Sequence, residues 1–151
     1  VFFFGHRDQE SVHPFLSIET KSTRGIQTLE VSGYHLVLVK AHSSIESIEA
    51  RMIIPGNALV TSDGSLEQVN RVTSVYSRGL MNPHTIDGRI IVNGFQASCF
   101  TSVVPPILGQ ALLLPERWAY RVGRSILGDI LHLGRPKLFN LVLNTVGQSR
   151  N

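Results

Sequence analysis

The sequence predicts an all-β fold, an antiparallel body followed by a helical tail. Two observations support this prediction. Up to about residue 102, short apolar runs of strand length alternate with turn dipeptides. After Pro105-Pro106, apolar residues recur at helical spacing instead. The chain has 151 residues, the length of one domain with a small extension.

The strands can be placed from their apolar patterns. Phe15–Thr20 and Ile26–Val31 both alternate between apolar and polar residues, and the polar segment Lys21–Gly25 joins them as a hairpin loop. Leu36–Val39 is a continuous apolar run, which is typical of a buried strand. Val1–Phe4 is too short for the core of a signal peptide, and we expect it to form part of a strand.

Three dipeptides predict tight turns between strands. Asp63-Gly64 and Asn93-Gly94 both suit a type I′ turn, which needs a positive φ at both central residues. Asp87-Gly88 marks a third turn. Such closely spaced turns favour an antiparallel body in which strands pair with neighbours that are distant in the sequence.

The segment from 105 to 151 predicts an amphipathic helical tail. Pro115 suits the first turn of a helix, and Gly134 suits its end. One broad face is apolar, and we expect it to pack on the β body; its residues are Trp118, Val122, Ile126, Ile130 and Leu133. The opposite stripe is basic, and we expect it to be solvated; its residues are Arg117, Arg121 and Arg124.

Composition narrows the class of protein. With 42% hydrophobic and 17% charged residues, the chain is not a disordered charged segment. Its basic character lies in residues 101–151, which carry 6 Lys and Arg against 2 Asp and Glu, whereas residues 1–100 carry 8 against 9. A single cysteine, Cys99, excludes an internal disulfide framework and a cysteine-based zinc site. We expect a monomer with no cofactor, no metal and no nucleic-acid partner.

Three local patterns carry the candidate chemistry. The first is Ser32–Val37, in which a hydroxyl and an imidazole lie three residues apart before the buried strand. The second is Pro83–Gly94, a turn followed by a hairpin, and the third is Gln96–Phe100, which contains the single thiol. Together, in this order and spacing, they resemble the Hint domain of hedgehog-type C-terminal autoprocessing proteins, including the nematode-type relatives. The resemblance extends over residues 1–104.

The resemblance implies a horseshoe-like β domain that is similar to a self-splicing intein. In the family, a cysteine at the first residue of the domain attacks the preceding carbonyl and forms a thioester. A sterol hydroxyl or water then releases the N-terminal partner. We therefore expect the chain to be an N-terminally truncated piece of a secreted signalling protein, which acts in cis on its own precursor segment in the secretory pathway. Without the upstream cysteine, this polypeptide alone is expected to be inactive.

Four residues take site roles through the resemblance. His35 matches the histidine that donates a proton to the departing amide nitrogen, and Ser32 stands where the family has a threonine that holds the strained amide. Cys99 matches a supporting thiol near the active centre. His6 replaces the aspartate of sterol-transferring members, so the acceptor is a sterol, another nucleophile or water. An imidazole can also accept a proton at neutral pH.

Other interpretations remain open. The chain could be a non-catalytic, Hint-shaped interaction module, in which Ser32 and His6 mark a decayed site. A cysteine protease that uses Cys99 and His35 is disfavoured, because reactive thiolates usually lie at helix N-termini and Cys99 ends a hairpin. The tail at 105–151 occupies the position of the family's adduct-recognition region, and its basic, Trp118-bearing helix is compatible with a membrane interface.

The remaining histidines show no ligand spacing in the sequence. His13, His42 and His132 lie far apart and are expected at the surface.

Overall fold

The computed structural model describes residues 1–22, 25–103 and 106–124. In this part of the chain one antiparallel sheet of eight strands is followed by two short helices, which confirms the predicted all-β class. The strands are β1 (Phe3–Ser22), β2 (Gly25–Val31), β3 (His35–Ala41), β4 (Ser44–Glu49), β5 (Ala58–Val60), β6 (Leu66–His84), β7 (Arg89–Val92) and β8 (Phe95–Thr101). A 3-10 turn spans Ala50–Met52, and the helices are α1 (Pro106–Leu112) and α2 (Leu114–Arg121).

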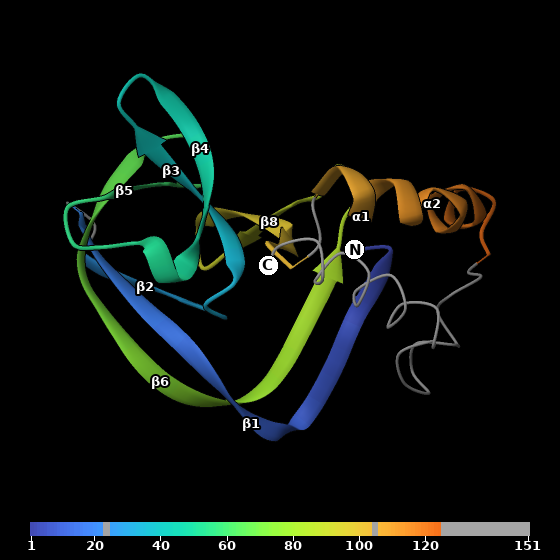
Figure 1. The fold of residues 1–151 in the computed structure, drawn as a ribbon, viewed down its shortest axis with the longest axis horizontal. Coiled ribbons are helices and arrows are strands. Elements are labelled where there is room, and N and C mark those ends of the chain that lie inside the picture. Colours follow the sequence, from blue (N-terminus) through green and yellow to red (C-terminus); the bar gives the residue numbers. More distant parts are fainter. Residues whose placement is uncertain (23–24, 104–105, 125–151) are drawn as a thin grey trace, which may run out of the picture.

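The sheet is curved and nearly closed. Its strand order is β2-β1-β6-β5-β3-β8-β7, with β4 added beside β3, and an isolated bridge between Thr61 and Phe95 links distant parts of it. The long strands β1 and β6 run side by side along their whole length and curve together around the body (Figure 1). Their pairing brings Phe3 next to His84, so the start of β1 and the end of β6 meet at the helical end of the molecule.

The main hydrophobic core fills the inside of this curved sheet. Its members come from segments that lie far apart in the sequence: Ile18, Leu29, Val31, Val37, Val39, Ala50, Ile53, Leu59, Val69 and Phe95. Most of them are fully buried aliphatic side chains, each of which contributes about 1.5–3 kcal/mol on burial. The predicted strands therefore bury many of the apolar positions from which they were predicted, although Ile26 is 70% exposed.

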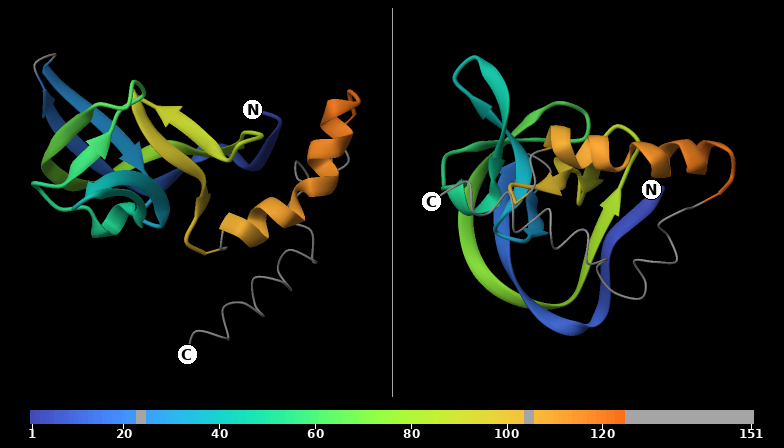
Figure 2. Two further views of the ribbon diagram at one scale, coloured as in Figure 1. Left: turned by 90° about the horizontal axis from the view of Figure 1, so that it is seen from above. Right: turned by 45° about the vertical axis from the view of Figure 1, so that its right-hand side comes forward.

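A second, smaller cluster lies where the helices meet the strands. Phe3, Cys99, Phe100 and Leu113 form it, and they come from β1, β8 and the junction of the two helices. Gly109 of α1 packs directly on the Phe100 ring, since an added Cβ would lie 2.7 Å from Phe100 Cε1. Both views in Figure 2 show the helices at this end of the molecule, beside the N-terminus. This second cluster fixes the wall of the candidate site.

The turn predictions are confirmed in part. Asn93 and Gly94 both have a positive φ, of 48° and 87°, as a type I′ turn requires. At the Asp63-Gly64 turn only Gly64 has a positive φ, so the type I′ prediction is wrong there. Asp63 instead accepts hydrogen bonds from the Thr61 hydroxyl and the Ser65 backbone N–H, which hold its backbone in an ordinary conformation.

The helical tail differs from its prediction. A helix already begins at Pro106, and the face that α2 turns inward carries Glu116 and Ala119. Trp118 is 66% exposed, so the expected packing of that apolar face on the β body is wrong for Trp118 and for the equally exposed Val122. Arg117 is half-buried rather than solvated, with its guanidinium 5.9 Å from the centre of the Phe2 ring.

The rest of the tail prediction falls outside the described residues. Ile126, Ile130, Leu133 and Gly134 all follow residue 124, and His132 does as well. The division of the chain at residue 104 stays a prediction. No helix among the described residues is long and apolar enough to span a membrane.

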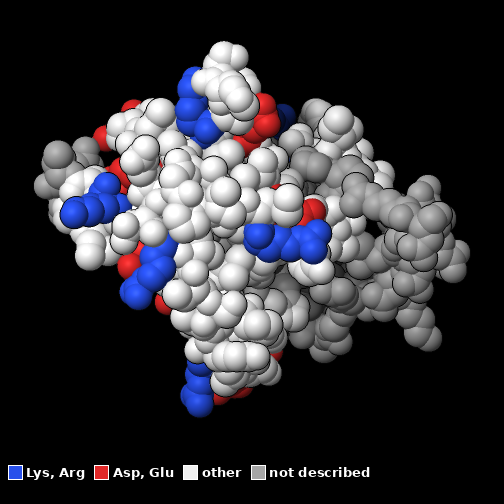
Figure 3. Space-filling model, turned by 60° about the vertical axis from the view of Figure 1, so that its left-hand side comes forward, with Lys and Arg blue, Asp and Glu red and all other residues white. Residues whose placement is uncertain are grey.

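Surface charge is mixed on the face of the body shown in Figure 3, where small groups of basic side chains lie next to acidic ones. Ion pairs in the described part of the chain include Arg71 with Glu19 and Arg51 with Glu49. Exposed pairs of this kind each contribute only about 0–1 kcal/mol to stability.

Candidate active site

A cleft of about 320 Å³ opens between the end of the β1–β6 pair, the β2–β3 turn, β8 and α1. All four residues that the sequence predicts for the site line it: His6, Ser32, His35 and Cys99. The rest of its wall is mainly apolar and aromatic, with Phe3, Tyr34, Leu80, Met81, Phe100, Thr101, Val103, Leu112 and Leu113, and includes Gly5, Asn82, His84 and Gly109. The structure thus brings the predicted residues together, while their chemical roles stay predictions.

A tight turn holds Ser32 and His35 together. The backbone N–H of His35 donates to the Ser32 carbonyl at 3.0 Å, which closes the four-residue turn between β2 and β3. The turn is anchored on both sides: the Arg51 N–H donates to the Gly33 carbonyl at 2.9 Å, and the Ser102 N–H donates to the Tyr34 carbonyl at 3.0 Å. The hydroxyl and the imidazole are therefore presented to the cleft from a fixed backbone.

His35 has one ring nitrogen held and the other unpaired. Burial lowers the pKa of His35, and a hydrogen bond to the Ser98 backbone opposes this shift. That bond raises the pKa because the ring donates to the carbonyl, which leaves Nε2 as the acceptor nitrogen of a neutral imidazole. His35 Nε2 is buried and has no hydrogen-bond partner among the described residues. Buried polar atoms are almost always satisfied, so an unpaired imidazole nitrogen in a cleft is typical of a functional group.

Cys99 is bonded as a thiol. Its sulfur accepts the Thr85 backbone N–H at 3.4 Å and lies 3.3 Å from the Thr85 hydroxyl. The single hydroxyl hydrogen of Thr85 is already drawn to the Asp87 carboxylate at 2.7 Å or the Arg89 carbonyl at 2.6 Å. The Cys99 S–H must therefore donate to Thr85 Oγ1. A buried thiol with both contacts satisfied is suited to support the site rather than to act as a nucleophile.

His84 is a site residue that the sequence analysis missed. It ends β6 and lies buried between the rings of Phe3 and Phe100, at centroid distances of 5.6 and 5.2 Å. Burial, together with the positive charge of Arg117 and the neighbouring His35, lowers the pKa of His84 to about 4. His84 Nδ1 has no hydrogen-bond partner among the described residues. His84 is thus a neutral imidazole beside His35.

Gly5 and Asn82 are two further residues of the cleft wall. An added Cβ on Gly5 would lie 2.9 Å from His84 Nε2, so only glycine lets β1 pass this ring. Asn82 Oδ1 is buried without a hydrogen-bond partner in the described part of the chain.

The sequence signal that could have identified His84 is its position between Pro83 and Thr85 of the turn motif. No sequence pattern indicated that it would be buried.

His6 and His13 both depart from a simple surface position. His6 lies in β1 at the rim of the cleft and is half-buried. The expectation that His13 is a surface residue without ligand spacing is wrong, since it is half-buried and its Nε2 lies 3.0 Å from Asp8 Oδ2. The reason is a register shift in β1 between Asp8 and Val12, which brings two positions five residues apart onto one side of the strand.

Comparison with protein families identifies the family of the chain. The family model described as the Hint module matches residues 1–135, which includes the whole cleft. This chain belongs to the Hint module family. Membership agrees with the resemblance predicted from the three sequence patterns, and these patterns supply the cleft residues Ser32, His35 and Cys99.

Relatives of this Hint module are found among much longer proteins. The hedgehog protein of Drosophila virilis is 29% identical over 126 residues, which cover 80% of this chain and 26% of that protein. The hedgehog protein of Drosophila hydei is 30% identical over 78% of this chain and 25% of its own length. Warthog protein 6 of Caenorhabditis elegans is 27% identical over 73% of this chain and 19% of its own length. The chain thus spans about a quarter or less of these relatives.

Among solved structures, the solution structure of the KlbA intein precursor from Methanococcus jannaschii is similar to this chain. The two align with a TM-score of 0.49 and 16% sequence identity, over 64% of this chain and 54% of the intein chain.

Proposed function

We propose that this Hint module is the catalytic scaffold of a self-processing protein. In the precursor, a cysteine at the first residue of the complete domain attacks the preceding carbonyl, and the peptide bond becomes a thioester. The released partner is the precursor's own N-terminal segment. Membership in the Hint module family and similarity to hedgehog proteins support self-processing in general. The thioester route rests on the cleft described above.

The observation that carries this proposal is the unpaired Nε2 of His35. A peptide nitrogen is a poor leaving group unless it gains a proton as the C–N bond breaks. His35 Nε2 is buried, faces no other partner among the described residues, and is aligned by the Ser98 carbonyl. A neutral imidazole of this kind can take the proton of the attacking thiol and return it to the departing nitrogen.

The balance of this first step is simple. The sulfur of the upstream cysteine forms a bond with the carbonyl carbon, and the C–N bond breaks with its electron pair moving to nitrogen. The thiol proton passes through His35 to that nitrogen, which becomes a free amine. In this step the Ser32 hydroxyl, which lines the same cleft, holds the distorted amide by a hydrogen bond. Cys99 supports the wall of the cleft through Thr85.

Mass spectrometry of the N-terminal product from the full-length precursor tests the proposal. A product that ends at the module boundary, with the mass of a free acid or of an ester adduct, supports self-processing. An uncleaved precursor that carries an intact folded module would instead favour the non-catalytic interaction module.

His6 is assigned to the second step, in which the thioester passes to a sterol, another nucleophile or water. The incoming hydroxyl must lose its proton, and His6 lies at the rim of the same cleft. We expect His6→Ala to slow product release at least about tenfold and to spare thioester formation, which uses His35. Thioester accumulation and product release are followed separately in the precursor, with and without sterol. Unchanged release in both conditions would remove His6 from the mechanism.

The tail is proposed to contact a membrane or a lipid acceptor. Trp118, Leu114 and Val122 are exposed on α2, and Arg121 lies 5.8 Å from the centre of the Trp118 ring. Exposed apolar side chains beside basic ones are typical of helices that lie in a membrane interface. A secretory route for the parent protein is proposed on the similarity to hedgehog proteins.

A further inference from the structure

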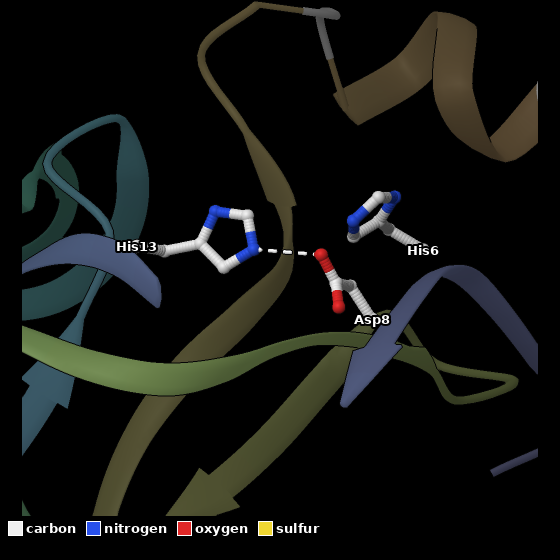
Figure 4. Close-up of side chains that lie close together, drawn as sticks. All are labelled: His6, Asp8 and His13. Carbon is white, nitrogen blue, oxygen red and sulfur yellow. Dashed lines mark hydrogen bonds and ion pairs between the residues drawn. The ribbon is translucent and has the colours of Figure 1, made fainter. Parts of the chain in front are cut away.

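Strand β1 carries a cluster of two imidazoles and one carboxylate that the proposed chemistry of His35 does not use. His6, Asp8 and His13 project from neighbouring parts of this strand toward one another (Figure 4). Between Asp8 and Val12 the pairing with β6 shifts, so that residues 9–11 bulge out opposite Gly79. Gly79 has a φ of +87°, and an added Cβ there would lie 3.4 Å from the Asp8 carbonyl oxygen, so the bulge depends on this glycine. The bulge is what returns His13 to Asp8.

The carboxylate of this cluster is fixed and ionised. Asp8 Oδ1 accepts the backbone N–H groups of Glu10 and Ser11, both at 3.0 Å. These bonds and the contact with His13 hold the pKa of Asp8 well below its usual range. The other oxygen, Oδ2, lies 3.0 Å from His13 Nε2. One oxygen is thus used to orient the group, and the second is presented to the histidines, an arrangement common around metal-binding carboxylates.

The three ligand atoms are close enough to share one ion. One ligand atom from each residue lies within 4.8 Å of the other two. Atoms that bind one Zn²⁺ at about 2.0–2.2 Å in tetrahedral geometry lie about 3.5 Å apart. The His6 ring packs edge-on to His13 at a centroid distance of 6.4 Å and makes no hydrogen bond among the described residues. Binding one ion therefore requires these atoms to approach one another from up to 4.8 Å to about 3.5 Å.

We propose that His6, Asp8 and His13 bind one divalent transition-metal ion of the Zn²⁺ type. Two imidazoles and one carboxylate are a donor set that zinc and similar metals accept, and three protein ligands leave one position for water. His6 belongs to both the cluster and the wall of the cleft, so the ion lies at the rim of the candidate active site. In this arrangement His6 serves the second step as a ligand of the ion, and the ion takes over the removal of the proton.

This position suggests what the ion does, a role that rests on the proposed self-processing. A metal ion of this type lowers the pKa of its bound water to about 7 and supplies hydroxide at neutral pH. The hydroxide oxygen forms a bond with the thioester carbonyl carbon, and the C–S bond breaks with its electrons moving to sulfur. The proton of the resulting acid passes to that sulfur. The products are a carboxylate on the N-terminal partner and the free cysteine thiol, so water is the acceptor.

Metal binding is tested on this chain directly, with Zn²⁺ in calorimetry and Co²⁺ in visible absorption. We expect one ion per chain and the intense absorption of tetrahedral Co²⁺. His13→Gln and Asp8→Asn should each weaken binding by more than the roughly 10–100-fold that loss of an outer-shell partner costs, because each removes a direct ligand. Asp8→Asn keeps an oxygen for the Glu10 and Ser11 N–H groups, so the bulge should stay folded, which circular dichroism checks.

Two control variants separate this site from other metal ligands. His42→Asn removes an imidazole outside the cluster at a position with a φ of 43°, which asparagine tolerates, and should bind as the unchanged chain does. Cys99→Ser should also bind normally, because its thiol is not part of the cluster. Absence of Zn²⁺ binding, or equal loss in the His42 variant, would overturn the site.

The role is tested separately in the precursor without added thiol. A chelator should slow thioester hydrolysis and leave thioester formation unchanged, and Zn²⁺ should restore hydrolysis. Binding without any effect of the chelator would overturn the role and leave the site standing. A precursor that forms no thioester would contradict the proposed function, whereas the binding result does not depend on it.

Discussion

Replacing His35 with alanine in the intact precursor is expected to slow thioester formation by about 10²–10⁴-fold, the usual contribution of a positioned acid or base. The physical reason is that the amide nitrogen then departs without a proton. The side chain lost in this variant is the buried one whose Nε2 is unpaired and whose other nitrogen bonds to the Ser98 backbone. The measurement is the rate of precursor cleavage by dithiothreitol, which traps the thioester.

Two comparisons make the His35 result specific. His42→Asn removes an imidazole that does not line the cleft, and should cleave at the normal rate. Thermal unfolding of both variants shows whether the fold survives, since His35 begins β3 and its backbone also pairs with Thr101. A folded His35→Ala variant that cleaves within about threefold of the unchanged precursor would refute the role, because the loss predicted for an acid or base is far larger.

The second large effect is on stability below neutral pH. The pKa of His84 is about 4 in the folded chain and about 6.5 when it is unfolded. Between these values the unfolded chain binds the proton that the folded chain excludes. Stability is therefore complete above about pH 6.5 and falls as the pH decreases toward 4, by about 3 kcal/mol in total. The lowered pKa of His35 acts in the same direction.

Urea unfolding at several pH values between 4.5 and 7.5, roughly the window set by the two pKa values, checks this expectation. His84→Leu fills the space between Phe3 and Phe100 with an apolar side chain. The stability of this variant should lose most of the pH dependence that His84 contributes. His42→Asn should retain it. Because carboxylates titrate in all three proteins, the difference between His84→Leu and the unchanged chain is the quantity of interest. If the free energy of unfolding changes with pH in the same way in those two proteins, His84 is not a buried neutral imidazole.

Local features of the fold were predictable because their causes are local. Ile26–Val31 lies within a strand at its predicted place, since alternation and a polar loop are read from adjacent residues. The turn at Asn93-Gly94 follows from two residues that tolerate positive φ. The full length of β1, from Phe3 to Ser22, was not predictable. Its polar middle has no apolar alternation, and it becomes a strand only because β6 pairs with it.

In the candidate site, too, features with local causes were predictable and features assembled from distant residues were not. Ser32 and His35 are close because one turn joins them, and the three-residue spacing alone predicted that. His84 packs against aromatic rings from β1 and β8, and a charge from α2 contributes to its lowered pKa; no local pattern contains these neighbours. His13 reaches Asp8 only through a bulge that depends on Gly79 in another strand. Both were missed because their environments are assembled from distant parts of the chain.

The bonding of Cys99 has a practical consequence for labelling. Alkylating reagents react with exposed thiolates, but this sulfur is 1% exposed and its hydrogen is held by Thr85. We therefore expect that Cys99 does not react with iodoacetamide or maleimide while the module is folded. In a precursor with a cysteine at the module boundary, that residue would be labelled selectively. A fluorophore placed there would report directly on the chemistry of the boundary, with no need to remove the native thiol.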